Sequence, residues 1–155
     1  MVGCVDGMLR TYDLRKGLLH TDTLVDPVVS VRLSYGGNSV ASLCLGKGKG
    51  GGNIYRYELG SPSLSKVWRK SGNSAFKSEC CFSSEGNVVI SGDESGHLKW
   101  CGDDKDAAYH VGSMIGEQSQ AHSAAISSLS HHPHDTLLLS AAYEEEMYLW
   151  QIDYS

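Results

Sequence analysis

Basic residues, long apolar runs and prolines are all scarce in this 155-residue chain. Thirteen lysine and arginine residues stand against eighteen acidic ones, which gives a formal net charge of -5. Because no basic excess exists to neutralise phosphates, the composition disfavours electrostatically driven binding to nucleic acid. No apolar run approaches the ~20 residues of a membrane-spanning helix, and the first residues lack the regions of a signal peptide. We therefore expect a cytoplasmic or nuclear protein without a membrane partner.

The cysteines do not indicate a disulfide framework. Their number is odd, and the adjacent pair would point to opposite faces of any strand. No Cys-x-x-Cys spacing occurs, so packing between strands is favoured over redox or metal chemistry. We interpret them as reduced, buried thiols: Cys4, Cys44, Cys80, Cys81 and Cys101.

Glycine, in contrast, is abundant, with eighteen residues against only three prolines. The glycines fall between short runs rich in Val, Leu, Ile and Tyr. Short strands separated by glycine turns are typical of all-β proteins. Hydrophobic residues make up 41% of the chain, which suffices for a packed core. The composition therefore predicts one all-β domain or a part of one.

A repeat runs through the whole chain. Four short strand-like segments each end in an aromatic residue or a cysteine: Tyr12, Tyr57, Cys101 and Trp150. These residues are 45, 44 and 49 positions apart. A second spacing leads from a Leu or Phe to a serine nine to eleven residues later, at Ser42, Ser91 and Ser140. The two spacings agree on a turn position at Ser95 and at Glu144. In the second unit they differ by five residues, which predicts an insertion within Gly46–Gly52.

This pattern resembles the WD-repeat β-propeller family, whose blades have four strands and a period of roughly 40–45 residues. The resemblance implies a buried polar network of His, Ser, Asp and Trp that pins each blade. The fourth unit comes closest, with His122, Ser140, Glu144 and Trp150. The other units keep one of these residue types each, Ser91, Ser42 or Asp6, and have another residue in place of Trp: Cys101, Tyr57 and Tyr12 respectively. These residues are expected to be structural, not catalytic.

The repeat predicts a partial propeller of about three and a half four-stranded blades over residues 1–155. We expect a blade remnant over 1–24, blades over 25–70 and 71–115, and an incomplete last blade over 116–155. Two blade edges would be open, so missing blades or a second copy of the chain would be needed for closure. In the least regular region, the sequence predicts a strand over 108–114.

A finer resemblance links the chain to the mitogen-activated protein kinase organiser family of WD-repeat scaffolds. Four segments carry it in order: Asp6–Arg15, Glu79–Ser83, Val88–Ser91 and His132–Pro133. It implies a non-catalytic scaffold that organises kinase-cascade components. Two alternatives remain: a WD-repeat component of the spliceosome or mRNA-processing machinery, and a fragment of a propeller enzyme. The expected inner strands offer mainly Ser, Cys and apolar residues, which disfavours the enzyme.

The remaining motifs indicate no catalytic residue, cofactor or metal. His131, His132 and His134 fit a turn between two strands better than a zinc site. Gly46–Gly52 lacks the Gly-Lys-Ser/Thr ending of a phosphate-binding loop. It predicts a mobile hairpin tip that carries Lys47 and Lys49 towards an acidic partner surface, the alternative being a tolerated insertion. Two acidic clusters are interpreted as solvated turns: Asp103, Asp104 and Asp106, and Glu144–Glu146.

Overall fold

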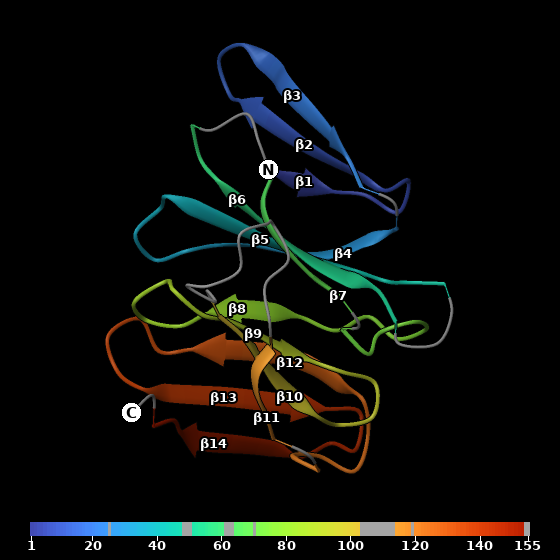
Figure 1. The fold of residues 1–155 in the computed structure, drawn as a ribbon, viewed down its shortest axis with the longest axis vertical. Helices are drawn as coiled ribbons and strands as arrows, with labels where there is room; N and C mark the ends of the chain where they lie inside the picture. The colour runs from blue at the N-terminus through green and yellow to red at the C-terminus, as the bar shows by residue number, and fades with distance from the viewer. Residues whose placement is uncertain are drawn as a thin grey trace.

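Four antiparallel sheets follow one another in chain order and stack as an arc (Figure 1). The computed structural model describes residues 1–24, 26–47, 51–60, 64–69, 71–102, 114–118 and 120–153. These ranges form strands and turns without a helix. In this described part, accordingly, no helix has the length and apolar character that crossing a membrane requires.

The strands have the following bounds. The first sheet contains β1 (Val2–Gly3), β2 (Met8–Asp13) and β3 (Gly17–Thr23). The second contains β4 (Val28–Leu33), β5 (Ser39–Cys44), β6 (Asn53–Glu58) and β7 (Leu64–Arg69). The third contains β8 (Cys80–Phe82), β9 (Val89–Gly92), β10 (Leu98–Cys101) and β11 (Met114–Gln118). The fourth contains β12 (Ile126–His131), β13 (Leu137–Ala142) and β14 (Met147–Gln151).

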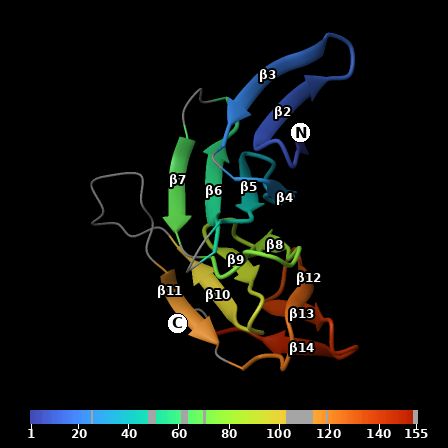
Figure 2. The ribbon, with the colours of Figure 1, turned by 90° about the vertical axis from the view of Figure 1, so that its right-hand side faces the viewer.

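Within each sheet the strands lie in order across the arc, and we call β4, β8 and β12, which lie along one side of it (Figure 2), the inner strands. Figure 2 shows β4, β8 and β12 along one side of the arc, and β7 and β11 along the other. Because consecutive strands are antiparallel, their connections alternate between two rims. We call the rim with residues 4–7, 45–47, 71–79, 93–97 and 143–146 the upper rim. The lower rim carries residues 14–16, 34–38, 59–60, 83–88 and 132–136.

The core consists of three apolar layers, one between each pair of neighbouring sheets. Leu9 of the first sheet packs with Tyr57 of the second. Ile54 of the second packs with Cys101 of the third. Leu98 of the third packs in a layer that Trp150 of the fourth also contacts. Both faces of β5 are covered, and all six of its residues are buried.

Hairpin turns on the upper rim require a left-handed backbone. Gly7, Gly51 and Gly96 have φ angles of 79°, 71° and 83° at this position. Glycine adopts that conformation without a steric penalty. In the last hairpin Glu145 takes the same place with φ at 68°, where a side chain is disfavoured.

The structure confirms an all-β, partial and unclosed propeller, as the repeat predicted. Of the predicted strand over 108–114, only Met114 lies within the described residues, as the first residue of β11, which pairs with β10. Its expected beginning falls within residues 103–113, which lie outside the described ranges. The sequence there follows neither spacing of the repeat, so the repeat could not define where the predicted strand begins and ends.

Candidate functional site

The four predicted network residues of the last sheet meet. Glu144 Oε1 lies 2.5 Å from His122 Nδ1, and His122 Nε2 lies 2.7 Å from the Ser140 hydroxyl. The indole of Trp150 donates to the same hydroxyl at 2.7 Å. With the Nδ1 proton directed at the carboxylate, Nε2 accepts from Ser140, whose oxygen accepts from Trp150. Glu144 therefore fills the aspartate position despite its longer side chain.

Glu144 also fixes the start of the blade. Its Oε2 accepts hydrogen bonds from the amide (2.6 Å) and the hydroxyl of Ser123. The Ser123 hydroxyl and the His122 ring hold the pKa of this carboxyl below its usual value. The His122 side chain has no exposed surface. The network therefore joins the buried interior of the blade to the exposed Ser123 at its start and stabilises the blade.

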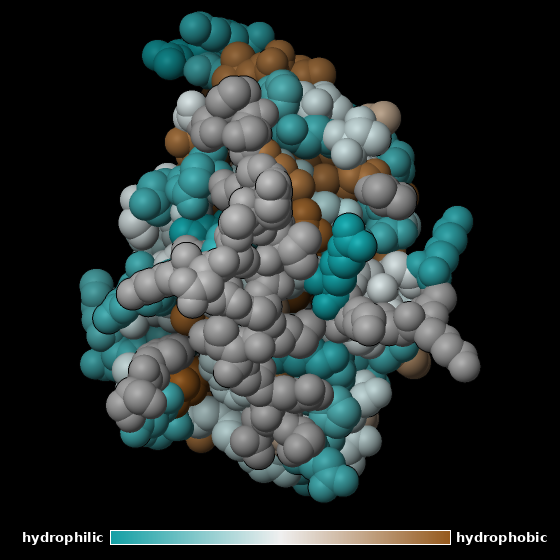
Figure 3. All heavy atoms as spheres, in the orientation of Figure 1, coloured by the Kyte–Doolittle hydropathy of each residue, from teal (hydrophilic) through white to brown (hydrophobic). Residues whose placement is uncertain are grey.

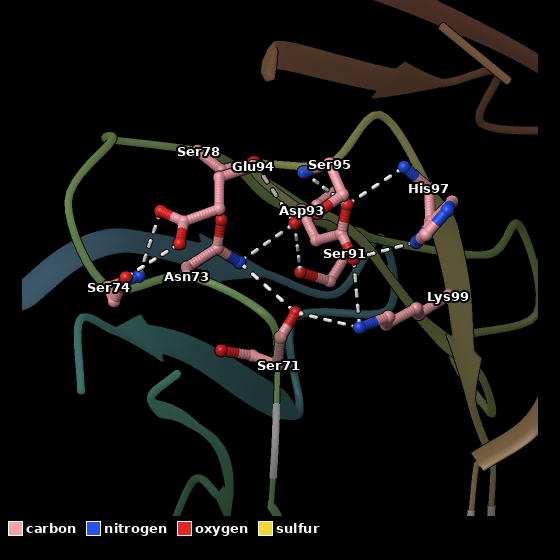
Figure 4. Close-up of polar contacts among 11 residues, drawn as sticks. Ser71, Asn73, Ser74, Ser78, Ser91, Asp93, Glu94, Ser95, His97 and Lys99 are labelled. Carbon is pink, nitrogen blue, oxygen red and sulfur yellow. Dashed lines mark hydrogen bonds and ion pairs between the residues drawn. The ribbon is translucent and has the colours of Figure 1, made fainter. Parts of the chain in front are cut away.

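The third sheet replaces this network with a different polar cluster (Figure 4). Asp93, which is 3% exposed, forms ion pairs with Lys99 at 2.9 Å and with the ring of His97 at 3.2 Å. Its other oxygen accepts from the amides of Ser95 and His97. The predicted turn residue Ser95 thus takes part only through its backbone. Ser91 donates to the Gly92 carbonyl instead, and Cys101 packs in the core.

Asn73 connects this cluster to the neighbouring loop. Its side-chain amide donates to the carbonyls of Gly92 and Ser71, at 2.9 and 3.3 Å. Its own carbonyl accepts from the amides of Gly46 (3.0 Å) and Gly52 (2.8 Å). The two ends of the predicted insertion are therefore tied to the third sheet. Lys47 is exposed, whereas Lys49 lies outside the described residues, so the predicted mobility of the loop tip stays a prediction.

The first two sheets do not assemble the polar network. Asp6 accepts from the amide of Met8 and from Arg10, whose guanidinium holds the pKa of this carboxyl low. Tyr12 is exposed. In the second sheet the Ser42 hydroxyl is fully buried without a hydrogen-bond partner, and Tyr57 packs in the first apolar layer. The first two sheets share an apolar layer instead.

A polar bridge that the sequence did not predict joins the inner strands. Arg32 of β4 pairs with Glu79 at 2.7 Å, and Glu79 accepts from Ser128 of β12 at 2.7 Å. Burial acts to raise the pKa of Glu79, but the bonds from Ser128 and Arg32 outweigh it, so the pKa is lowered. A cavity of about 340 Å³ lies beside this bridge and is also lined by Tyr35 and His131.

His131 and four of the five cysteines are buried. His131 ends β12 and is 2% exposed, so it is a buried strand residue and not part of the turn. Among the described residues, no group of three potential ligands could hold a metal ion. Burial raises the thiol pKa of Cys80 to about 11 and those of Cys44 and Cys101 to about 12. The acidic cluster at Asp103, Asp104 and Asp106 lies outside the described residues.

The upper rim exposes large apolar side chains. Phe76, in the connection before β8, contacts Tyr143, in the turn before β14, with ring centroids 5.8 Å apart. Both rings are more than half exposed. Glu94 holds the neighbouring backbone, because it accepts from the amides of Ser74 (3.1 Å) and Ala75 (3.0 Å). Phe76 is thus presented on a loop that hydrogen bonds to Glu94 hold in place.

Comparisons with known proteins agree with this architecture. Residues 115–151 match the family model described as "WD domain, G-beta repeat". Two similar proteins are an uncharacterised WD repeat-containing protein of Schizosaccharomyces pombe (24% identical) and WD repeat domain-containing protein 83 of Xenopus tropicalis (29% identical). Each alignment covers 97% of this chain, but only 47% and 44% of the respective relative.

Among solved structures, the crystal structure of the computationally designed Ika4 protein is similar. Its TM-score is 0.72 at 19% identity, over 97% of this chain and 83% of that one. This likeness concerns the fold alone. The chain therefore has the fold of an unclosed β-propeller and spans less than half the length of the two relatives, and the matches support a WD-repeat family.

Proposed function

We propose that this chain is a non-catalytic scaffold that binds other proteins through its upper rim. The observation that carries the proposal is the exposed Phe76–Tyr143 pair. Half-exposed aromatic rings in mutual contact are typical centres of protein–protein interfaces, because they bury a large area at a small entropic cost. WD-repeat domains generally serve as such platforms, which agrees with the family match.

The rim elements beside this pair form one connected surface. Asn73 joins the glycine loop to the connection before β8, and Glu94 joins that connection to the turn before β10. The aromatic contact then reaches the turn before β14. Lys47 is exposed on the same rim. A partner surface with an apolar centre and acidic groups facing Lys47 would fit this arrangement.

The polar groups of the inner strands support a role without catalysis. Both carboxylate oxygens of Glu79 are occupied, one by Arg32 and the other by Ser128. His122 is enclosed between Glu144 and Ser140. A general base must reach the proton that it removes from a substrate, and neither group is presented in that way. The enzyme alternative therefore finds no support in these residues.

As partners we propose components of mitogen-activated protein kinase cascades, in the cytoplasm or nucleus and without a cofactor. The organiser resemblance of Asp6–Arg15, Glu79–Ser83 and Val88–Ser91 supports this choice. The second candidate is a WD-repeat component of the mRNA-splicing machinery. The two candidate functions are distinguished by the proteins that bind to the chain, which are kinase-cascade components for the first and splicing components for the second.

Quantitative affinity capture tests the proposal. The wild-type chain should enrich kinase-cascade proteins from lysate, and the double variant Phe76→Ala/Tyr143→Ala should lose them. The matched control is Leu14→Ala/Leu59→Ala, which removes two exposed apolar side chains from the lower rim and should retain them. Enrichment of spliceosomal subunits would favour the second candidate. Equal capture by the rim variant and the wild type would refute binding through the upper rim.

A further inference from the structure

The strand registers define equivalent positions in the four sheets. Leu9, Ile54, Leu98 and Met147 each pair with the corresponding residue of the preceding strand: Gly3, Leu43, Gly92 and Ala141. Leu9, Ile54 and Leu98 are 0% exposed because the next sheet covers them. Met147 is 70% exposed. The last sheet therefore presents a face of the kind that a following blade covers elsewhere in the chain.

Two neighbouring positions on this face are exposed as well. Leu139 is 42% exposed, while its equivalents Ala41 and Ile90 are 0% exposed. Leu149, which pairs with Leu139, is 68% exposed. We call the surface of Leu139, Met147 and Leu149 the tail face. Exposed large apolar side chains of this density are unusual on a monomer and indicate an interface.

The first sheet presents the complementary face. Tyr57 is 8% and Cys101 0% exposed, because each packs on the preceding sheet, but their equivalent Tyr12 is 47% exposed. Val2, and Leu18 opposite Tyr12 on β3, are also exposed. We call the surface of Val2, Tyr12 and Leu18 the head face. Apolar side chains are visible at the end of the molecule that the first sheet forms, which is at the top of Figure 3.

We propose that two copies of this chain close into one ring, with the tail face of each copy on the head face of the other. Each copy carries one tail and one head, so two such contacts satisfy both copies. A head-to-tail contact gives a closed ring when its rotation closes and a filament when it does not. Two copies supply eight sheets, within the usual range of about 4–8 blades.

The lengths of the relatives agree with two copies. The chain spans 47% and 44% of their lengths, so two copies provide about as many residues as one relative. The contacts would repeat the packing that already joins the sheets within the chain. Within the chain, Leu98 of the third sheet belongs to the apolar layer against which Trp150 of the fourth sheet packs. In the proposed dimer, Met147 takes the place of Leu98 and Tyr12 of the other copy takes the place of Trp150.

Light scattering coupled to size-exclusion chromatography tests closure on the full chain. The wild type should elute as a monodisperse dimer. Leu149→Arg on the tail and Tyr12→Arg on the head should each weaken the dimer by roughly thirtyfold or more, the effect of losing a central interface side chain. Phe76→Arg is the matched control, because it places the same charge on an exposed apolar rim position and should leave the dimer intact.

Mixing the two variants identifies the direction of the contact. Alone, each variant lacks both working contacts of the ring, whereas a mixture regains one intact tail–head contact and should form a one-to-one dimer. A symmetric tail-to-tail contact would instead leave Tyr12→Arg dimeric. Circular dichroism of each variant verifies folding. A monodisperse wild-type monomer, or open-ended oligomers that grow with concentration, would overturn the proposal while leaving partner binding by the upper rim unaffected.

Discussion

Replacing Ser140 by alanine tests the network of the last blade. The Ser140 hydroxyl is 0% exposed and joins His122 and Trp150, each at 2.7 Å. Its removal leaves the Nε2 of a buried imidazole and a partly buried indole N–H without partners. An unsatisfied buried polar group costs about 1–3 kcal/mol. We therefore expect Ser140→Ala to lower the free energy of unfolding by about 2–4 kcal/mol.

The chain contains a matched control for this variant. Ser42 occupies the equivalent position of the second blade and is equally buried, but its hydroxyl has no hydrogen-bond partner. Because removing an unpaired buried hydroxyl relieves a desolvation cost, Ser42→Ala should be neutral or slightly stabilising. Urea unfolding of both variants, followed by tryptophan fluorescence at one fixed protein concentration, measures the difference. Equal losses in the two variants would refute the claim that hydrogen bonding, and not packing, makes Ser140 important.

Three further predictions concern other groups. The lowered pKa of Glu144 stabilises the folded state above the carboxyl's ordinary pKa of 4.5; this contribution should be lost as the pH falls through the lower folded pKa. Acid titration of stability should therefore show a smaller loss in Glu144→Gln than in the wild type. Because four thiols are buried, a thiol reagent at neutral pH should label only Cys4 rapidly, and mass spectrometry of the labelled peptides checks this. Glu145→Gly should stabilise the chain by about 0.5–1 kcal/mol, since glycine accepts the positive φ at this turn; an unchanged melting temperature would contradict this.

The last blade was the most predictable part of the site. The resemblance to WD-repeat blades implied that His122, Ser140, Glu144 and Trp150 form one network, and the structure brings all four together. Hairpin pairing fixes the distances between residues that are near in sequence. The repeat likewise predicted an all-β, partial propeller, which the structure confirms.

Contacts between sheets were beyond such reasoning. Arg32 and Glu79 are 47 residues apart and meet only because their inner strands lie in neighbouring sheets. The Asp93–Lys99 ion pair was missed for another reason: both residues belong to one hairpin of the third sheet, but a lysine on a strand usually faces solvent. His131 was expected in a turn, but β12 continues to it and buries its ring.

Cross-linking mass spectrometry of the captured complex tests the central claim that the upper rim binds partner proteins. Three exposed lysines report on the two rims: Lys47 and Lys77 lie on the upper rim, and Lys16 lies on the lower one. An amine-reactive cross-linker should join partner peptides to Lys47 and Lys77, and not to Lys16. Partner cross-links concentrated at Lys16, with Lys47 and Lys77 free of them, would contradict the account.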